Sequence, residues 1–525
     1  MIAFLLLPVV IVSKSFAQVP SLVEKNGRYA LMVDGAPYLM LAAQVNNSSA
    51  WPAALPDVWP AVEQMHINTL QVPIAWEQIE AQEGEFDFSF VDLLIKQARQ
   101  RNIRLALLWF GTWKNNAPHY APSWVKLNNT RFPRVITKEG KTLNSLSPHA
   151  SSTLEADRRA FVALMRHLKK KDKKHTVIMM QVENESGTYG SVRDFSPLAQ
   201  SIFEKTVPQV LLDALGKKAG TWQQVFGKDA DEFFHAWSIA RFCEEVALAG
   251  KAVYPLPMNV NAALRDPFNP GKPGAYASGG PTDNVLSIWK AGAPSIDIIS
   301  PDIYMREYDR YQAVLAHYAR DDNALFVSET GNDRDYARYI FSVLGKQGIG
   351  FSPFGMDFTG YANYPLGAKV VNEKTIEPFA EVYSIIAPMA REWAALSFEN
   401  KVWGSAEASD KHSETLDLGL WDVEVSYGRP QFWIDPPTGN DPPSGGALIA
   451  QLSANEYLVT GFRTRLGFKA SAENKERSFM IERVEEGHFE KGKWVFHRVW
   501  NGDQTDWGLN FGTKPTLLKV RLATY

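Results

Sequence analysis

The sequence predicts an α/β fold, a (β/α)8 TIM barrel followed by a C-terminal antiparallel β-rich domain. First, eight short apolar segments alternate with amphipathic helical patterns between residues 38 and 396. Second, from about residue 400 the chain becomes alternating and rich in turns, as in GALIAQLSANEYLVTGFRTRLGF. Third, no glycine-rich phosphate-binding turn follows the first strand, which disfavours a doubly wound open sheet.

Each element has a local signal. Asn26-Gly27 and Asp34-Gly35 separate short apolar segments and predict two β-hairpins before the barrel. Helical patterns such as FVDLLIKQARQRN and EADRRAFVALMRHLKKK lie between the strands. The eight barrel strands are expected at 38–45, 67–76, 103–110, 176–185, 254–262, 296–304, 324–329 and 348–356. After the helix at 377–396 the pattern changes, so we expect a barrel with its N-terminal hairpins at 18–397 and a β-sandwich-like domain at 398–525.

The N-terminus resembles a cleavable signal peptide covering residues 1–17. MIAFLLLPVVIV is too short to span a bilayer comfortably, and Ser15 and Ala17 suit the small-residue positions of a signal-peptidase site. A buried N-terminal strand is the alternative. The single cysteine, Cys243, excludes intrachain disulfides and lies in a helical pattern typical of an inert core thiol. These features predict a periplasmic or secreted bacterial protein, and no later run is long and apolar enough for a membrane span.

Composition places the chain among ordinary globular proteins. It has 525 residues, 45% hydrophobic and 22% charged, with a formal net charge of −3. This charge indicates neither a nucleic acid nor an anionic membrane as partner. Length and composition do not predict an oligomeric state.

The carboxyl ends of the strands carry the chemistry, because in such a barrel they face one pocket. The stretch QVENESGTYG, residues 181–190, ends a buried strand with Glu183, Asn184 and Glu185. Burying a carboxylate is costly unless it is paired or its pKa shifts, so this polar end predicts a site. The other strand-end residues are Gln44, Asn47, Trp76, Glu77, Trp113, Asn259, Asp302, Tyr304, Glu329 and Phe354.

Glu185 and Glu329 end the fourth and seventh strands, and a barrel brings such ends together. Two carboxylates about 5–5.5 Å apart are what a retaining glycosidase needs. The chain has no HExxH, paired-histidine or CxxC pattern and no GxSxG elbow, so we predict no metal and no cofactor. Strand alternation does not choose between Glu183 and Glu185, and the pattern alone leaves a generic barrel site open.

Several segments resemble glycoside hydrolase family 35, the β-galactosidases of clan A. They are QVENE at the fourth strand, NTLQVPIAWEQIEAQEGEFDFSF (68–90), LFVSETG (325–331) and GFSPFGMDFTGYANY (350–364). The resemblance covers roughly residues 30–365, and the C-terminal part resembles the β-rich appendage of some bacterial members. It implies that Glu185 is the acid/base and Glu329 the nucleophile. It also implies that Asn184 binds the sugar 2-hydroxyl and that Tyr304 orients the nucleophile.

The predicted substrate-binding set is completed by strand-end residues whose roles are less specific. Trp113 either stacks on the sugar or fills the barrel rim, whereas Trp76 is more simply a core residue. The chain departs from the family at Ser186, where a tyrosine is common, at Thr112, where an acidic residue is usual, and near Pro73, where the second strand usually has a tyrosine. The full set is Asn184, Tyr304, Trp113, Gln44, Asn47 and Glu77.

The resemblance implies a retaining, exo-acting β-galactosidase for terminal β-D-galactosyl residues of plant-type oligo- and polysaccharides. The pattern is similar to bacterial members that remove galactose from xyloglucan side chains. Long loops at 114–150 and 263–290 are placed to wall the pocket. The alternatives are another clan A exo-glycosidase, such as a β-glucosidase, β-glucosaminidase or arabinosidase, and a carbohydrate-binding protein without catalysis. Retention of both glutamates disfavours the last.

Overall fold

The structure is a computed structural model that describes residues 18–428, 438–474 and 478–525. The expected signal peptide, residues 1–17, lies outside the described residues, so the signal peptide and the exported location remain predictions. Among the described helices, none has the length and apolar character needed to cross a membrane.

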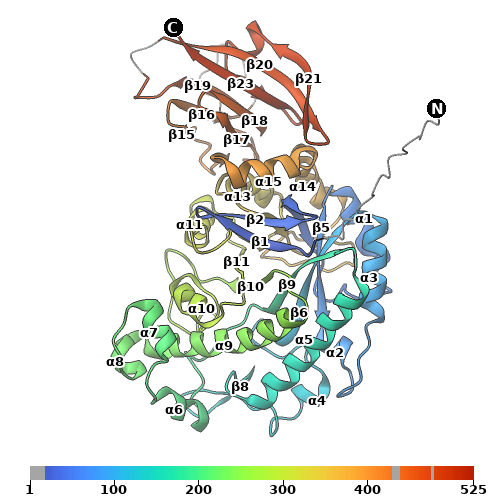
Figure 1. Cartoon of the computed structure of the whole chain (residues 1–525), viewed down its shortest axis with the longest axis vertical. Helices are drawn as coiled ribbons and strands as arrows, with labels where there is room; N and C mark the ends of the chain where they lie inside the picture. Colours follow the sequence, from blue (N-terminus) through green and yellow to red (C-terminus); the bar gives the residue numbers. More distant parts are fainter. Residues whose placement is uncertain (1–17, 429–437, 475–477) are drawn as a thin grey trace, which may run out of the picture.

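Eight parallel strands close into the expected barrel in the lower half of the molecule (Figure 1). Around the barrel each strand pairs with its neighbours in the order β10-β11-β12-β13-β4-β5-β6-β9. Each predicted strand range overlaps one of them, and β6, β10 and β12 extend beyond the predicted ends. The strands are β4 (Met40–Gln44), β5 (Thr69–Ala75), β6 (Arg104–Lys114), β9 (Val177–Asn184), β10 (Met258–Ala263), β11 (Ile298–Ile303), β12 (Phe326–Thr330) and β13 (Gly350–Pro353).

Helices cover the outside of the barrel because each has one apolar face. In α3, Phe90, Val91, Leu94 and Ile95 are all buried, as a period of 3.6 residues requires. The longer helices are α1 (Leu55–Gln64), α3 (Ser89–Gln100), α5 (Ser151–Lys171), α9 (Ala230–Val253), α11 (Tyr308–Tyr318), α14 (Glu373–Ile386) and α15 (Ala390–Glu399). The shorter ones are α2 (Trp76–Ile79), α4 (Ser123–Lys126), α6 (Pro197–Phe203), α7 (Gln209–Leu215), α8 (Trp222–Phe226), α10 (Leu286–Gly292), α12 (Arg334–Ala337) and α13 (Tyr339–Gly345).

Two N-terminal hairpins close the amino-terminal end of the barrel, opposite the carboxyl ends of its strands. They form a sheet of β1 (Ser21–Lys25), β2 (Arg28–Val33) and β3 (Ala36–Tyr38). At the two predicted turns, Asn26-Gly27 and Asp34-Gly35, every residue has a positive φ, as a type I′ turn requires. The apolar side chains of this sheet share a core with residues from the amino-terminal half of the barrel. That core includes Leu31, Val33, Met40, Ala42, Ala106, Met179 and Phe326.

The barrel interior changes from apolar to polar toward the carboxyl ends of its strands. Above the apolar layer, the Gln71 side chain donates to the Ser352 hydroxyl at 2.7 Å and to the Ser328 carbonyl at 2.6 Å. Asn259 lies in the same buried layer, 3.4 Å from Gln181. Because these amides and hydroxyls pair with one another, they form an uncharged, hydrogen-bonded layer beneath the charged residues at the mouth of the barrel.

The C-terminal part is a sandwich of two antiparallel sheets, as predicted. One sheet has the order β14-β17-β18-β23-β20-β21, and the other has the order β15-β16-β19-β22. Their facing side chains form a separate apolar core that includes Trp421, Val423, Ile449 and Val459. The strands are β14 (Val402–Ala406), β15 (Glu414–Asp417), β16 (Trp421–Tyr427), β17 (Gly446–Ser453), β18 (Glu456–Phe462), β19 (Thr464–Ala470), β20 (Phe479–Glu490), β21 (Lys493–Trp500), β22 (Leu509–Phe511) and β23 (Leu517–Thr524). The exact domain limit remains a prediction.

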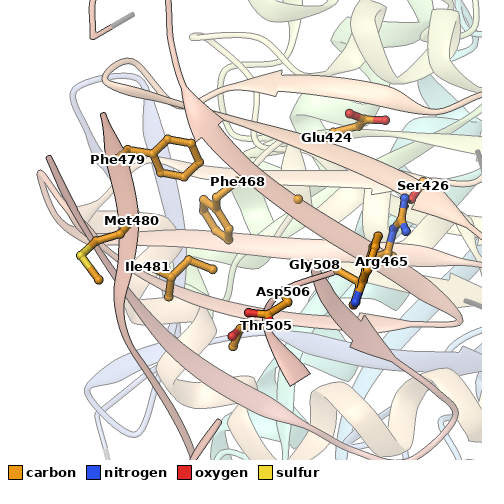
Figure 2. Close-up of a pocket in the computed structure, with 12 residues that line it drawn as sticks. Glu424, Ser426, Arg465, Phe468, Phe479, Met480, Ile481, Thr505, Asp506 and Gly508 are labelled. Atoms are coloured by element: carbon orange, nitrogen blue, oxygen red, sulfur yellow. Dashed lines mark hydrogen bonds between the residues drawn. The ribbon is translucent and has the colours of Figure 1, made fainter. Parts of the chain in front are cut away.

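A cavity of about 560 Å³ opens on this sandwich, between β16 and β19 on one side and β20 on the other (Figure 2). Phe468, Phe479, Met480 and Arg465 line it. None of the predicted site residues is among its lining residues. The cavity is therefore a feature of the appended domain, separate from the mouth of the barrel.

The sandwich is joined to the barrel through glycines. Gly404 of β14 lies against α13, where an added Cβ atom would stand 2.1 Å from the carbonyl oxygen of Phe341. Gly446 of β17 touches the ring of the same Phe341, and its Cβ atom would stand 2.0 Å from the ring. Only glycine allows the two domains to approach this closely.

Gly404→Ala should therefore destabilise the protein by about 1–3 kcal/mol, because the methyl group overlaps backbone that is not free to move. Thermal unfolding measures the effect. Gly512→Ala is the matched control, since an added Cβ there meets no atom within 4 Å. Equal melting temperatures for the two variants would contradict a tight glycine contact between the domains.

Candidate active site

Glu329 lies near the end of β12 and is almost fully buried, with 3% of its surface exposed. Gln44, the last residue of β4, donates its amide to Glu329 Oε1 at 2.8 Å. The Tyr304 hydroxyl donates to Glu329 Oε2 at 2.7 Å. Two donors on two oxygens hold this side chain in one orientation. The predicted residues Gln44 and Tyr304 therefore meet Glu329.

Glu185 lies just past β9, on the other side of the pocket. Its backbone N–H donates to Asn261 Oδ1 at 2.8 Å, and its φ is +46°. One carboxylate oxygen from each of Glu185, Asp302 and Glu329 lies within 4.8 Å of the others. Burial, opposed by the Lys114 ammonium and reinforced by the negative charge of Glu329, raises the pKa of Glu185 to about 7.

Asp302 is a third carboxyl group of the site, and the predicted site set omitted it. It accepts from the Asn261 amide at 2.7 Å and from the Ser328 hydroxyl at 2.8 Å. Burial is the main reason that its pKa lies well above the usual range, and the charges of Glu329 and Glu185 add to the effect. Asp302 is the next-to-last residue of β11, and it was among the expected strand-end residues without being included in the predicted site.

Asn184 and Asn261 connect the two halves of the mouth. Asn184 Oδ1 accepts from Gln181 at 3.1 Å and from Asn261 at 3.2 Å. The same Asn261 contacts Asp302 and the backbone of Glu185. Asn261 was also missed, although it occupies the end of β10 in the segment NVNA. One asparagine thus links three of the residues that define the pocket.

Glu183 does not face the pocket. Glu183 Oε2 accepts the backbone N–H of Trp113 at 2.7 Å. An added Cβ atom on Gly111 would stand 2.7 Å both from Glu183 Oε1 and from Asp157 Oδ2 on α5, so the two carboxyl groups converge outside the barrel wall. Burial and the nearby charge of Asp157 raise the pKa of Glu183 well above its usual range. A proton retained on Glu183 would allow this carboxyl group to donate a hydrogen bond to Asp157.

Thr112 belongs to this outer cluster as well. Its backbone N–H and its hydroxyl both donate to Asp157, at 2.9 and 2.5 Å. Asp157 also accepts the indole N–H of Trp109 at 2.8 Å. The position at which the family usually has an acidic pocket residue is therefore turned away from the pocket here.

Three predicted substrate-binding residues are not brought to the carboxylates. Trp113 is a correction: its ring packs on Phe242 of α9, with centroids 4.7 Å apart, and its indole N–H donates to the Leu146 carbonyl. Glu77 lies on α2 and pairs with Lys126 at 2.7 Å. Asn47 is half-buried after β4, and the structure shows no contact between it and Glu185 or Glu329. Trp76 is a core residue, with its indole bonded to Glu80.

The three clustered carboxyl groups have the oxygen chemistry that a hard cation prefers. However, Glu329 and Asp302 each already accept two hydrogen bonds from uncharged donors. These donors can compensate the carboxyl groups without an ion. The absence of a metal remains a prediction.

Comparison with known proteins adds a family for part of the chain. Residues 50–234 match the family model of glycoside hydrolase family 42, described as beta-galactosidase. Residues 379–512 match a domain of unknown function, DUF5597. The first match includes Glu185 but ends before Glu329. A search of curated proteins returned no match.

Solved structures show the same fold. A β-galactosidase from Bacillus circulans sp. alkalophilus matches with a TM-score of 0.50 and 13% identity, covering 71% of this chain and 58% of that chain. A β-galactosidase from the psychrophilic Marinomonas ef1 matches with a TM-score of 0.50 and 11% identity, covering 69% and 62%. The present chain thus spans about three fifths of the length of each.

The matched segment is similar to a glycoside hydrolase family, in agreement with the glycoside hydrolase expected from the sequence. The matching family, however, differs from the family expected from the sequence. The family model that matches is that of family 42, and the resemblance to family 35 is not supported by it. Neither the family 42 description nor the two structures named above mentions xyloglucan.

The Glu183–Asp157 pair predicts a specific pH dependence of stability. The folded protein keeps a proton that the unfolded chain releases above the ordinary glutamate pKa of 4.5, so stability should fall as pH rises above that value. Glu183→Gln donates the same hydrogen bond without a titrating proton, and the fall should become smaller. Melting temperatures between about pH 5 and 8 measure this.

Glu183→Ala is the companion variant, because it leaves the Trp113 N–H without its acceptor. It should be less stable than Glu183→Gln throughout the pH range. If the glutamine variant kept the wild-type pH profile, the shared proton would be disproved.

Proposed function

We propose that this protein is a retaining, exo-acting β-galactosidase. The observation that carries the proposal is the close approach of Glu185 and Glu329 at the mouth of a clan A barrel, with carboxylate oxygens within 4.8 Å. Retaining glycosidases hold their two carboxyl groups about 5–5.5 Å apart, whereas inverting enzymes separate them by about 6.5–9.5 Å. The short spacing leaves no room for a water between nucleophile and sugar.

The environments of the two glutamates assign their roles. Glu329, which receives hydrogen bonds from Gln44 and Tyr304, is the ionised nucleophile and attacks the anomeric carbon. Glu185, with its pKa near 7, carries a proton at neutral or lower pH and gives it to the glycosidic oxygen. Water then attacks the glycosyl-enzyme, and Glu185 takes a proton from that water.

The surrounding amides support this reaction. Asn184 precedes the acid/base and is placed to bind the sugar 2-hydroxyl, a contact that strengthens in the transition state. Asn261 holds the backbone of Glu185 and the carboxyl group of Asp302. Because these groups are already fixed by hydrogen bonds, little reorganisation is needed when the sugar enters.

An exo mode is supported by contacts between the loops above the barrel. The segments after β9 and β10 pair through Thr188 and Ser278, and the Gly190 N–H donates to the Gly274 carbonyl. The N–H of Tyr189 also donates to Asn116 in the loop after β6. Loops joined in this way wall one side of the mouth, so we infer a pocket for a terminal sugar.

Exposed aromatic side chains favour a glycan substrate rather than a simple small galactoside. Trp51, Tyr189, Tyr361 and Tyr364 lie in the segments that follow β4, β9 and β13, and each is 40–58% exposed. Flat aromatic faces bind the apolar faces of sugars. These residues support a plant-type oligo- or polysaccharide such as xyloglucan, a choice that otherwise rests on the sequence resemblance. The expected signal peptide supports a periplasmic or secreted location for such an enzyme.

Another clan A exo-glycosidase is the alternative, because the catalytic pair is common to the clan. The residues that contact the sugar beyond C1 and C2 decide between β-galactoside, β-glucoside, β-glucosaminide and arabinoside. A panel of aryl glycosides separates these activities. A carbohydrate-binding protein without catalysis is disfavoured by the buried, hydrogen-bonded Glu329.

The reaction is tested with an aryl β-galactoside. Proton NMR of the first product should show β-galactose, because two displacements retain the configuration. A 2-fluoro galactoside should label Glu329, and Glu329→Gln should lose turnover by at least about 10³-fold, since the nucleophile is absent. An initial α-anomer, or label on another carboxylate, would refute the mechanism.

The substrate is tested with xyloglucan and its oligosaccharides. Galactose should appear while the length of the polymer, measured by size-exclusion chromatography, stays constant. Trp51→Ala should reduce kcat/KM on the oligosaccharide more than on the aryl galactoside, because only the former reaches the rim. A rapid fall in polymer length would instead indicate an open, endo-acting cleft.

A further inference from the structure

Lys114 is the last residue of β6 and is unusually buried for a lysine, with 5% of its surface exposed. Lysine is almost never this buried without a partner or a function. Its neighbour Trp113 packs outward on Phe242. The Lys114 head group instead lies beside Glu185, with Nζ 3.8 Å from Glu185 Oε2, at the mouth of the barrel.

The Lys114 ammonium has few partners within the described parts of the chain. Nζ donates to Asn115 Oδ1 at 2.5 Å and lies 3.8 Å from Glu185 Oε2. The second distance joins an ion pair but is too long for a hydrogen bond. An ammonium carries three N–H donors, and the structure shows an acceptor within hydrogen-bond distance for one of them.

The same cation balances an acidic site. Glu185, Asp302 and Glu329 share one pocket. Within the described residues, Lys114 is the one lysine or arginine whose head group lies within 4.0 Å of any of these three carboxyl groups. The titratable groups that face Glu185 are Lys114 from β6, Tyr189 after β9, Asp302 on β11 and Glu329 on β12. Of these, Lys114 contributes most to the ionised form of Glu185, and a hydrogen bond with Asp302 favours that form to a smaller extent.

We propose that Lys114 is a substrate-binding residue that donates a hydrogen bond to a hydroxyl of the terminal sugar beside Glu185 and also acts as the counter-charge of that glutamate. The proposal rests on the glycosidase function proposed above. A sugar hydroxyl fits the space between an ammonium with unused donors and a carboxyl group 3.8 Å away, because it accepts from the first and donates to the second.

The counter-charge is tested by the pH profile of kcat/KM. In the wild type, activity should fall as pH rises through about 7, since Glu185 then loses the proton that it must donate. Lys114→Met removes the charge that favours the carboxylate, so the alkaline limb should move upward by about one pH unit or more. Lys114→Arg keeps the charge and should largely restore the limb. Lys251→Met is the matched control, because Lys251 is also ion-paired, with Asp297 on the outside of the barrel.

The sugar contact is tested with 3-, 4- and 6-deoxy aryl galactosides. Lys114→Met should lower kcat/KM on the full substrate by about 10- to 100-fold, as expected for a lost hydrogen bond from a charged donor. On the deoxy substrate that lacks the contacted hydroxyl, Lys114→Met should lower kcat/KM little further. This double-mutant cycle identifies the hydroxyl that Lys114 contacts. If the losses in kcat/KM from Lys114→Met and from the missing hydroxyl were additive for all three deoxy substrates, the contact would be refuted. If Lys114→Met left the alkaline limb of the pH profile where it is in the wild type, the counter-charge would be refuted. If Lys114→Met does not fold, Lys114→Gln serves the same comparison.

These outcomes are separable from the proposed function. If the wild type cleaves a different aryl glycoside, the galactosidase assignment fails while the Lys114 tests proceed on that glycoside. If it cleaves none, the glycosidase function fails, and calorimetry with galactose, glucose and N-acetylglucosamine tests the contact by itself. Weaker binding by Lys114→Met would then support the contact, and equal or undetectable binding in both proteins would overturn it.

Discussion

The confinement of three carboxyl groups in one small buried space is the constraint on which the site depends. Glu185, Asp302 and Glu329 cannot all ionise within 4.8 Å of one another without a large cost. The structure meets this constraint by giving each group different partners. Glu329 has a tyrosine and a glutamine, Asp302 has an asparagine and a serine, and Glu185 has a nearby ammonium. This unequal distribution of donors separates an acid from a nucleophile.

The scaffold keeps those partners in place from below and from behind. Below the mouth, the amides and hydroxyls around Gln71 pair with one another, and the N-terminal sheet seals the apolar end. Behind it, the carboxyl pair of Glu183 and Asp157 joins the ends of β6 and β9 to α5. Glu183 and Glu185 both have positive φ values, which are uncommon for glutamate and are concentrated at functional sites. The outer hydrogen bonds of Glu183 therefore help to hold the strained strand end that presents Glu185.

Much of this architecture could be predicted from the sequence, because apolar runs and turn signals report strands and hairpins directly. Of the predicted strand-end residues, Gln44 and Tyr304 contact Glu329, and Asn184 contacts Asn261. The prediction failed where β6 and β9 become irregular. The third strand was expected to end at residue 110, whereas β6 continues to Lys114 through a register shift after Trp109, and the Trp113 ring packs outward on Phe242. Alternation likewise gave no choice between Glu183 and Glu185, because the positive φ values at both residues turn successive side chains away from the regular pleat. Asn261 was missed because its role is to connect other residues, and no local pattern reports that.

The family match and the geometry support the catalytic assignment from different directions. The matched segment, residues 50–234, contains β9 and Glu185, whereas Gln44, Tyr304 and Glu329 all lie outside it. A chain that shared only a barrel segment with glycosidases would have no reason to bring a buried glutamate, oriented by a tyrosine, to within 4.8 Å of Glu185. In the part of the site that lies outside the matched segment, Gln44 and Tyr304 already hydrogen-bond both oxygens of Glu329. The chemistry of the pair therefore depends on this geometry, whereas the identity of the sugar depends on contacts in the loops and at Lys114.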